Sequence, residues 1–166
     1  MTTYLVVPLL VVVVILQAAV VPHLTVWGVF ADLPVLFVVS WGLLRGPKEG
    51  TLWGFIAGIV VDLISGAPFG AATLSLMVVG FLSGLGKNSI FAGHFVFPVV
   101  TMFLSTILYN VCFLLIVWVS GQPVAWLDSS VSIVLPSAVL NAILAPIVFL
   151  PMRWVCMRFG QEEMEW

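Results

Sequence analysis

The sequence contains very little charge. Its 166 residues include only five basic and seven acidic residues, so charged side chains make up 7% of the chain. A soluble domain of this length carries about a quarter charged residues. Five basic residues cannot line a nucleic-acid groove, and a net charge of −2 favours no electrostatic partner. The shortage of charge therefore excludes a soluble fold and argues against nucleic-acid binding.

Side chains that carry chemistry are also scarce, since there are two cysteines and two histidines. Cys112 and Cys156 lie too far apart to bridge and have no metal-site spacing. His23 and His94 fall on opposite sides of the expected membrane, so neither has a buried serine partner for nucleophilic catalysis. The sequence therefore predicts a protein that is not an enzyme, with no cofactor and no metal.

Apolar residues are what the chain has in abundance. They make up 63% of the sequence, and the mean hydropathy is +1.28. Barrel strands alternate apolar and polar residues, whereas this chain has unbroken apolar runs such as residues 6–16 and 111–119. Because every backbone polar group must be satisfied inside lipid, such runs predict transmembrane helices. The fold class is an all-α membrane protein.

Six apolar blocks are separated by short polar breaks, which predicts a compact bundle of six transmembrane helices in a single domain, 1–166. The N-terminus lacks the basic region of a cleaved signal peptide, so the first block is expected to be a retained helix. The expected spans are approximately 4–21, 33–44, 51–64, 71–86, 95–119 and 129–152.

The basic residues orient this bundle. With six spans, all five fall on one face, and the positive-inside bias makes that face cytoplasmic. Both chain ends are then cytoplasmic as well. The predicted cytoplasmic residues are Arg45, Lys48, Lys87, Arg153 and Arg158. Tryptophans agree with this arrangement, because Trp118 maps to the outer membrane boundary, and Trp41, Trp53 and Trp154 map to the inner one.

Glycines recur at four-residue spacing in two of the expected helices. Such small-xxx-small stripes let helix backbones approach closely, which predicts tight packing among the second, third and fourth helices. Packing within this chain is favoured over binding another protein's helix. The predicted packing residues are Gly50, Gly54, Gly58, Gly80 and Gly84.

Polar groups at membrane depth are candidate sites, because they are costly to bury there. Asp32 precedes Leu33 and Pro34, which suits a helix N-cap. Asp62 has two equally weighted interpretations: it accepts hydrogen bonds from the outer turn at 65–70, or it faces a polar cavity. Asn110 and Asn141 are expected to make interhelical hydrogen bonds.

The last expected span contains three prolines, Pro136, Pro146 and Pro151. Each removes a backbone donor, so a bent final helix is predicted.

The order of several short motifs resembles the rod shape-determining protein MreD family. These motifs are Asp-Leu-Pro at 32–34, Trp-Gly-Leu-Leu-Arg-Gly-Pro-Lys-Glu-Gly at 41–50, Gly-x-x-x-Gly at 54–58, Asp-Leu-Ile-Ser-Gly-Ala-Pro-Phe-Gly at 62–70, and Gly-Phe-Leu-Ser-Gly at 80–84. The resemblance is densest over residues 32–86, and the chain's size and shortage of loops extend it further.

This resemblance implies a non-catalytic subunit of the bacterial cell-elongation machinery in the inner membrane. The implied partners are MreC, RodA with its penicillin-binding protein, the MreB filament and membrane lipid. The alternative is a substrate-binding subunit of an energy-coupling-factor vitamin transporter, since those S components are also small six-helix proteins and similar in architecture to this family. Helix 1 has adjacent Ala18 and Ala19 rather than the four-residue alanine spacing typical of those subunits.

Overall fold

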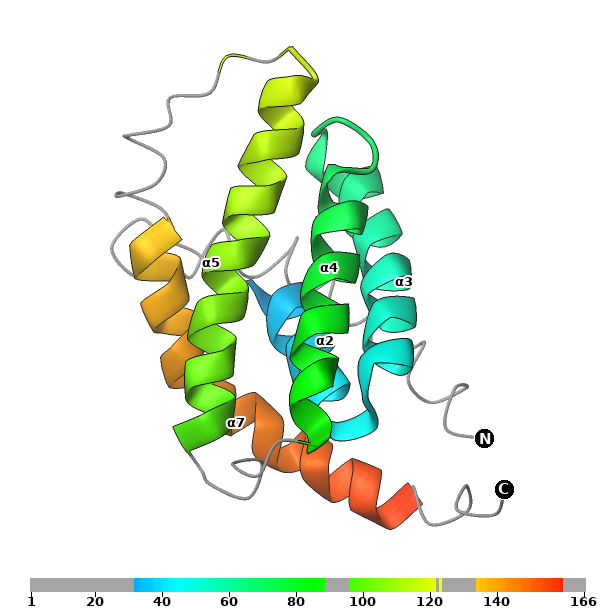
Figure 1. Cartoon of the computed structure of the whole chain (residues 1–166), viewed down its shortest axis with the longest axis vertical. Coiled ribbons are helices and arrows are strands. Elements are labelled where there is room, and N and C mark those ends of the chain that lie inside the picture. The colour runs from blue at the N-terminus through cyan, green and yellow to red at the C-terminus, as the bar shows by residue number, and fades with distance from the viewer. Residues whose placement is uncertain (1–31, 89–95, 122, 124–133, 160–166) are drawn as a thin grey trace.

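A computed structural model describes residues 32–88, 96–121, 123 and 134–159. Within these ranges the chain forms five α-helices and one short 3-10 helix, and Figure 1 shows them packed as a bundle. They are α2 (Leu33–Arg45), α3 (Pro47–Ser65), α4 (Ala71–Leu85), η2 (Gly86–Asn88), α5 (Val96–Val119) and α7 (Leu135–Phe159). The first expected span, 4–21, lies outside the described residues.

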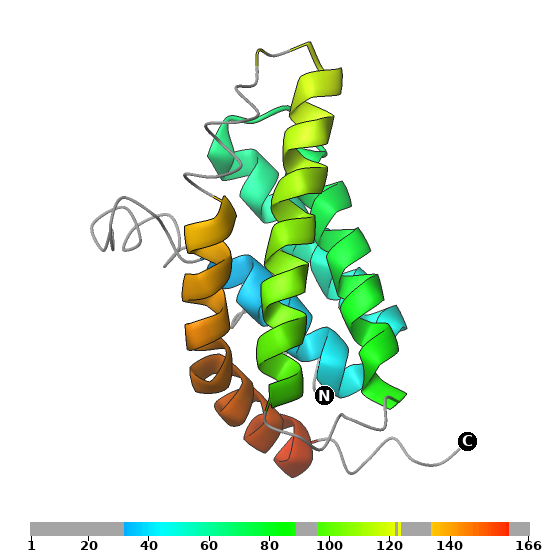
Figure 2. The same ribbon diagram turned by 60° about the vertical axis from the view of Figure 1, so that its left-hand side comes forward.

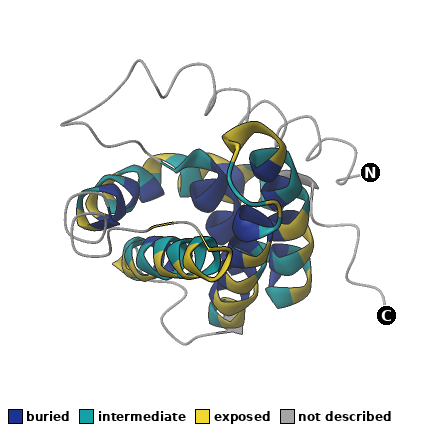
Figure 3. Ribbon diagram, turned by 90° about the horizontal axis from the view of Figure 1, so that it is seen from above, coloured by how far each residue is buried: buried dark blue, intermediate teal, exposed yellow. Residues whose placement is uncertain are grey.

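Helix α2 is the central element of the described bundle. It contacts α3, α4, α5 and α7, and all ten residues from Pro34 to Leu43 are buried. Figure 3, viewed from above, shows buried ribbon gathered in the centre and exposed ribbon on the outer faces. An apolar helix surrounded in this way needs no amphipathic pattern, which explains why its sequence is apolar on every side.

A single residue, Gly46, connects α2 to α3. Its φ of 107° lies in a region that L side chains rarely adopt, so a glycine is required for so short a turn. The Gly46 N–H donates to the Gly42 carbonyl at 2.7 Å, and the Gly46 carbonyl accepts from the Gly50 N–H at 2.9 Å. The predicted spans 33–44 and 51–64 left residues 45–50 as a connection, which is too long. Helix α3 begins at Pro47, where the missing proline N–H costs no helix bond.

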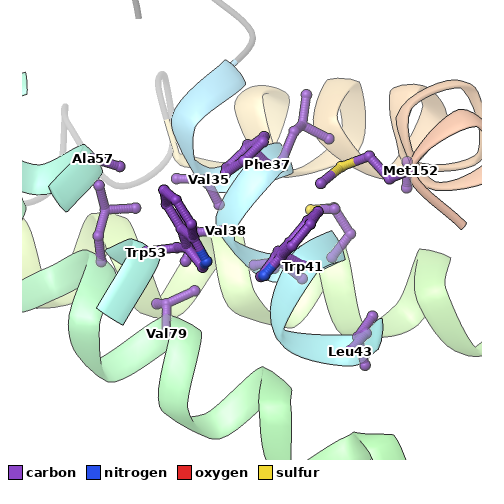
Figure 4. Packing of buried hydrophobic residues seen from close by; sticks show 14 residues of the cluster. Val35, Phe37, Val38, Trp41, Leu43, Trp53, Ala57, Val79 and Met152 are labelled. Carbon is purple, nitrogen blue, oxygen red and sulfur yellow. The ribbon is translucent and has the colours of Figure 1, made fainter. Parts of the chain in front are cut away.

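An aromatic cluster joins α2 to α3. Phe37 and Trp41 stack with ring centroids 6.0 Å apart, and the Trp53 ring meets Trp41 edge-on at 6.1 Å. Figure 4 shows Met152 of α7 reaching the same cluster. Trp41 and Trp53 are only 2% and 3% exposed, so both rings lie inside the bundle. Their predicted depth at the inner membrane boundary stays a prediction.

Two described helices are long and apolar enough to cross a membrane, at Val96–Val119 and Leu135–Met157. Helices α2 and α4 have 13 and 15 residues. At 1.5 Å per residue these are roughly 20 and 22 Å long, which is less than a hydrocarbon core of about 30 Å. A helix lies at each of the five expected spans from 33 onward, but the expectation that all of them cross the membrane stays a prediction.

Helix α7 bends along its length, as Figures 1 and 2 both show. Pro146 and Pro151 lie inside it, and each removes a backbone hydrogen bond. The predicted bend is therefore present. The helix also continues to Phe159, beyond the predicted end at 152, and its last turns run across the end of the bundle where α2 finishes.

Candidate functional site: polar and glycine contacts within the bundle

The seam between α3 and α4 is lined by glycines that lie against the backbone of the opposite helix. A Cβ placed on Gly50 or Gly80 would lie within 3 Å of the other residue's backbone, and one on Gly54 would meet the Leu76 carbonyl group equally closely. Gly58 and Gly84 similarly face the backbones of Thr73 and Pro47. Even an alanine would force these backbones apart. Helix α2 also reaches this seam, because a Cβ on Gly42 would lie 2.7 Å from the Ser83 hydroxyl.

Asp62 lies near the end of α3, one turn beyond Gly58 of this seam. Its carboxylate is buried and accepts the N–H groups of Gly70, Ala72 and Thr73 at 2.9, 2.9 and 3.0 Å. The Thr73 hydroxyl also donates to it at 2.5 Å. These donors belong to the first turn of α4, whose N–H groups have no partner within their own helix. Asp62 therefore caps α4 from the end of α3, and the carboxylate complements the positive end of the α4 dipole.

This arrangement bears on the two interpretations of Asp62. One of the four donors, the Gly70 N–H, belongs to the predicted outer turn at 65–70, and the other three belong to the first turn of α4. The alternative that Asp62 faces a polar cavity stays a prediction. Thr73 was missed in the sequence analysis. Thr73 follows Asp62 by eleven residues across a glycine-rich turn, and this spacing could have indicated that the two residues meet.

A second polar group joins α2, α5 and α7. The Asn141 Oδ1 accepts the Asp32 N–H at 3.0 Å, and its amide donates to the Thr106 hydroxyl at 3.2 Å. The Thr106 hydroxyl in turn donates to the Met102 carbonyl at 2.9 Å. Asn141 is fully buried, and Thr106 lies near the middle of α5. This group therefore lies about midway along α5, a helix of membrane length, and its hydrogen bonds are made within the protein.

Asp32 differs from the predicted N-cap. It occupies the N-cap position of α2, with Pro34 in the first turn, but its side chain makes no capping hydrogen bond. Its carboxyl instead has a hydrogen-bonding interaction with the Asn110 side chain, while its backbone N–H binds Asn141. Asn110 also donates to the Thr106 carbonyl at 2.8 Å within its own helix. The sequence pattern located the cap residue but could not identify partners 78 and 109 positions away.

Three of the predicted basic residues, Arg45, Lys48 and Lys87, lie at or beside the place where α2 ends and α3 begins. The Lys87 Nζ donates to the Arg45 carbonyl at 3.0 Å, and the Arg45 guanidinium lies 3.9 Å from Glu49 and 5.8 Å from the centre of the Trp41 ring. Glu49 also accepts the Trp41 indole N–H at 2.9 Å, a role that the sequence analysis missed. Lys48 and Arg153 are exposed. Arg158 lies within the last turn of α7, and its side chain is outside the described part.

In the described part of the chain, no three His, Cys, Asp or Glu side chains are grouped so that they could hold a metal ion. The polar groups described above bind one another or the backbone. Their chemistry is that of helix capping and helix-to-helix hydrogen bonding.

The family model of the rod shape-determining protein MreD matches residues 1–159. No solved structure matches the chain. The predicted architectural likeness to vitamin-transporter S components therefore stays a prediction.

Proposed function

This chain belongs to the rod shape-determining protein MreD family, and from that premise we propose that it is a scaffold subunit of the bacterial cell-elongation complex. The observation that carries the proposal is the extent of the family match, which covers residues 1–159 of 166. Membership implies a role in determining rod shape, and the family is generally non-catalytic. We propose that this chain likewise has no catalytic activity and uses no cofactor.

The chain is an integral membrane protein, given its family and its two membrane-length apolar helices. We propose that it resides in the bacterial inner membrane as a multi-pass protein. The end that carries Arg45, Lys48 and Lys87 would then face the cytoplasm, in keeping with the positive-inside bias.

The internal contacts support a scaffold function. Asp62 and Asn141, the buried groups with the greatest potential for chemistry, use their polar atoms to join helices. A rigid bundle of this kind interacts with other proteins through its outer helix faces and its turns. Those outer faces are apolar, as expected for contact with lipid or with another protein's transmembrane helix.

We propose that MreC binds the outward faces of α5 and α7. These are the two longest described helices, and neither carries the glycine seam that holds α3 against α4. The exposed apolar side chains of the two faces include Val100, Leu104, Leu115, Val139, Ile143 and Ile147. Through MreC the complex would include RodA with its penicillin-binding protein and the MreB filament. Lipid would surround the remaining surface, and no nucleic acid would bind.

Photo-crosslinking in the native membrane tests this proposal. A benzoylphenylalanine would replace Leu104 of α5 or Ile143 of α7, which are 60% and 61% exposed. Phe55 and Phe81 provide matched control positions on the outward faces of α3 and α4, at 43% and 47% exposure. An MreC adduct from the α5 or α7 position supports the proposed interface. Adducts from the control positions alone would move the interface to α3 and α4, and no MreC adduct at any position would contradict the partnership.

A further inference from the structure

The last turns of α7 occupy an unusual position for the end of a membrane-length helix. Figures 1 and 2 show that this segment turns from the direction of the first half of α7 and crosses the end of the bundle. Met152 fixes it there, because it is only 6% exposed and packs in the cluster that contains Trp41 and Leu43 of α2. The segment is thus held beside the turn between α2 and α3, at the basic end of the molecule.

The outward side of this segment carries large apolar side chains together with one arginine. Leu150, Arg153, Trp154 and Met157 follow the i, i+3, i+4, i+7 pattern of one helix face, and all four are exposed. Leu150, Trp154 and Met157 are 53%, 54% and 59% exposed. A face that combines large apolar side chains, an indole and a guanidinium is the composition of helices that lie in the bilayer interface.

Among the described residues, basic side chains outnumber acidic ones at this end. Arg45 and Lys87 meet where α2 ends, Lys48 and Arg153 are exposed, and Glu49 lies beside Arg45. The sequence adds Arg158 and the acidic residues Glu162, Glu163 and Glu165 shortly after this segment. Glu49 already lies 3.9 Å from Arg45 and accepts the Trp41 N–H, so it does not offset Lys48 or Arg153. Juxtamembrane basic groups of this kind attract the phosphates of anionic lipids.

We propose that residues 150–157 of α7 form an in-plane anchor that binds the anionic phospholipids of the leaflet at the basic end. Only the part of the Leu135–Met157 segment before residue 150 would then cross the membrane. Arg153, together with Lys48 and Lys87, contacts lipid phosphates. Leu150, Trp154 and Met157 lie among the glycerol groups and the upper acyl chains. The anchor fixes the depth of the bundle in the bilayer and does not depend on the proposed MreC interface.

Depth measurements on the full-length protein test the orientation. Cys112 and Cys156 are first replaced by alanine, and a nitroxide is then attached at position 150, 154 or 157 in nanodiscs. An in-plane segment places the three labels at one depth, near the phosphates. A segment that continues across the membrane changes depth by about 1.5 Å per residue, and such a gradient would overturn the proposal. Labels at Ile143 and Ile147, in the first half of α7 and near its bend, provide the depth reference.

Lipid retention tests the partner. Native mass spectrometry would count phosphatidylglycerol molecules carried by the protein from nanodiscs that contain phosphatidylcholine and phosphatidylglycerol. The Lys48→Gln/Arg153→Gln variant is expected to retain about half as many or fewer, because two of the attracting charges are lost. The matched variant Trp118→Leu, at the far end of α5, should retain the wild-type number. The anchor would be contradicted if wild type and the glutamine variant retained equal numbers of phosphatidylglycerol molecules. It would also be contradicted if protein instead of lipid shielded the nitroxide labels at positions 150, 154 and 157 in the native membrane.

Discussion

Asp62 of α3 and Thr73 of α4 are joined twice through one carboxylate oxygen. Oδ2 accepts the Thr73 N–H at 3.0 Å and the Thr73 hydroxyl at 2.5 Å. The same oxygen also accepts the Gly70 N–H at 2.9 Å. One side chain at the end of α3 therefore determines where α4 begins, and it holds the two helices at the separation that their facing glycines allow.

Replacing Asp62 should destabilise the fold strongly. In Asp62→Ala three backbone N–H groups lose their acceptor, and each buried donor without a partner costs about 1–3 kcal/mol. We expect a loss of about 3 kcal/mol or more, measured as a lower Tm in detergent. Asp62→Asn, which keeps one acceptor oxygen, should fall between Asp62→Ala and wild type.

Two alanine variants serve as controls for Asp62. Ser65→Ala alters an exposed neighbour in the same turn, and Asp128→Ala removes an acidic group elsewhere in the chain. Both should stay close to the wild-type Tm. If Asp62→Ala melts at the same temperature as Asp128→Ala, the capping role is contradicted.

Enlarging Gly54 should separate α3 from α4. A Cβ there would lie within 3 Å of the Leu76 carbonyl group, which is backbone and cannot rotate away. Overpacking costs about 1–3 kcal/mol in ordinary cores, so Gly54→Leu should reach or exceed the upper value. The matched control is Gly86→Ala, whose Cβ would meet the ends of the Phe97 and Leu43 side chains. Thermal melts that are equal for wild type and Gly54→Leu would disprove the close approach.

Removing the Asn141 amide should loosen α7 from α2 and α5. Asn141→Leu keeps the branched shape of the side chain but leaves the Asp32 N–H without its acceptor and the Thr106 hydroxyl without its donor. Interhelical hydrogen bonds in membranes contribute about 0.6 kcal/mol on average, so the two bonds together predict a loss of about 1 kcal/mol. A double-mutant cycle with Thr106→Val isolates the side-chain bond. Strict additivity of the two substitutions would mean that Asn141 and Thr106 do not interact.

The two core tryptophans should respond differently to substitution by phenylalanine. Trp41→Phe removes ring area and also the N–H that Glu49 accepts at 2.9 Å, whereas Trp53 meets the cluster through its ring. Trp41→Phe should therefore cost about 1 kcal/mol more than Trp53→Phe. In a Glu49→Leu background this difference should disappear. A difference that persists there would assign the effect to packing instead of the hydrogen bond.

Much of the helix segmentation could be predicted from sequence, because lipid requires long apolar runs and glycine or proline interrupts them. The bounds of α2 and α4 agree with the predicted 33–44 and 71–86 to within one residue. The start of α3 was wrong because Lys48 and Glu49 read as loop residues. In the structure both lie in its first turn, where Glu49 complements the helix dipole and binds Trp41.

Contacts between distant segments could not be predicted in the same way. Sequence periodicity shows on which side of its helix Asn141 or Trp41 lies, but it does not show which other helix that side contacts. The Asn141 bond to Asp32 spans 109 residues, and the burial of Trp41 depends on Trp53 and on Met152 of the bent α7. Glycine spacing was more informative, because a bare stripe lets another helix backbone approach closely.

The central claim is that this chain is a scaffold of the cell-elongation complex, and native mass spectrometry of the gently solubilised protein from its own membrane tests it most directly. The account predicts a complex that contains MreC, with or without the cell-wall synthase. A complex with energy-coupling ATPase subunits, or a tightly held mass of vitamin size, would contradict it and assign the chain to vitamin transport instead.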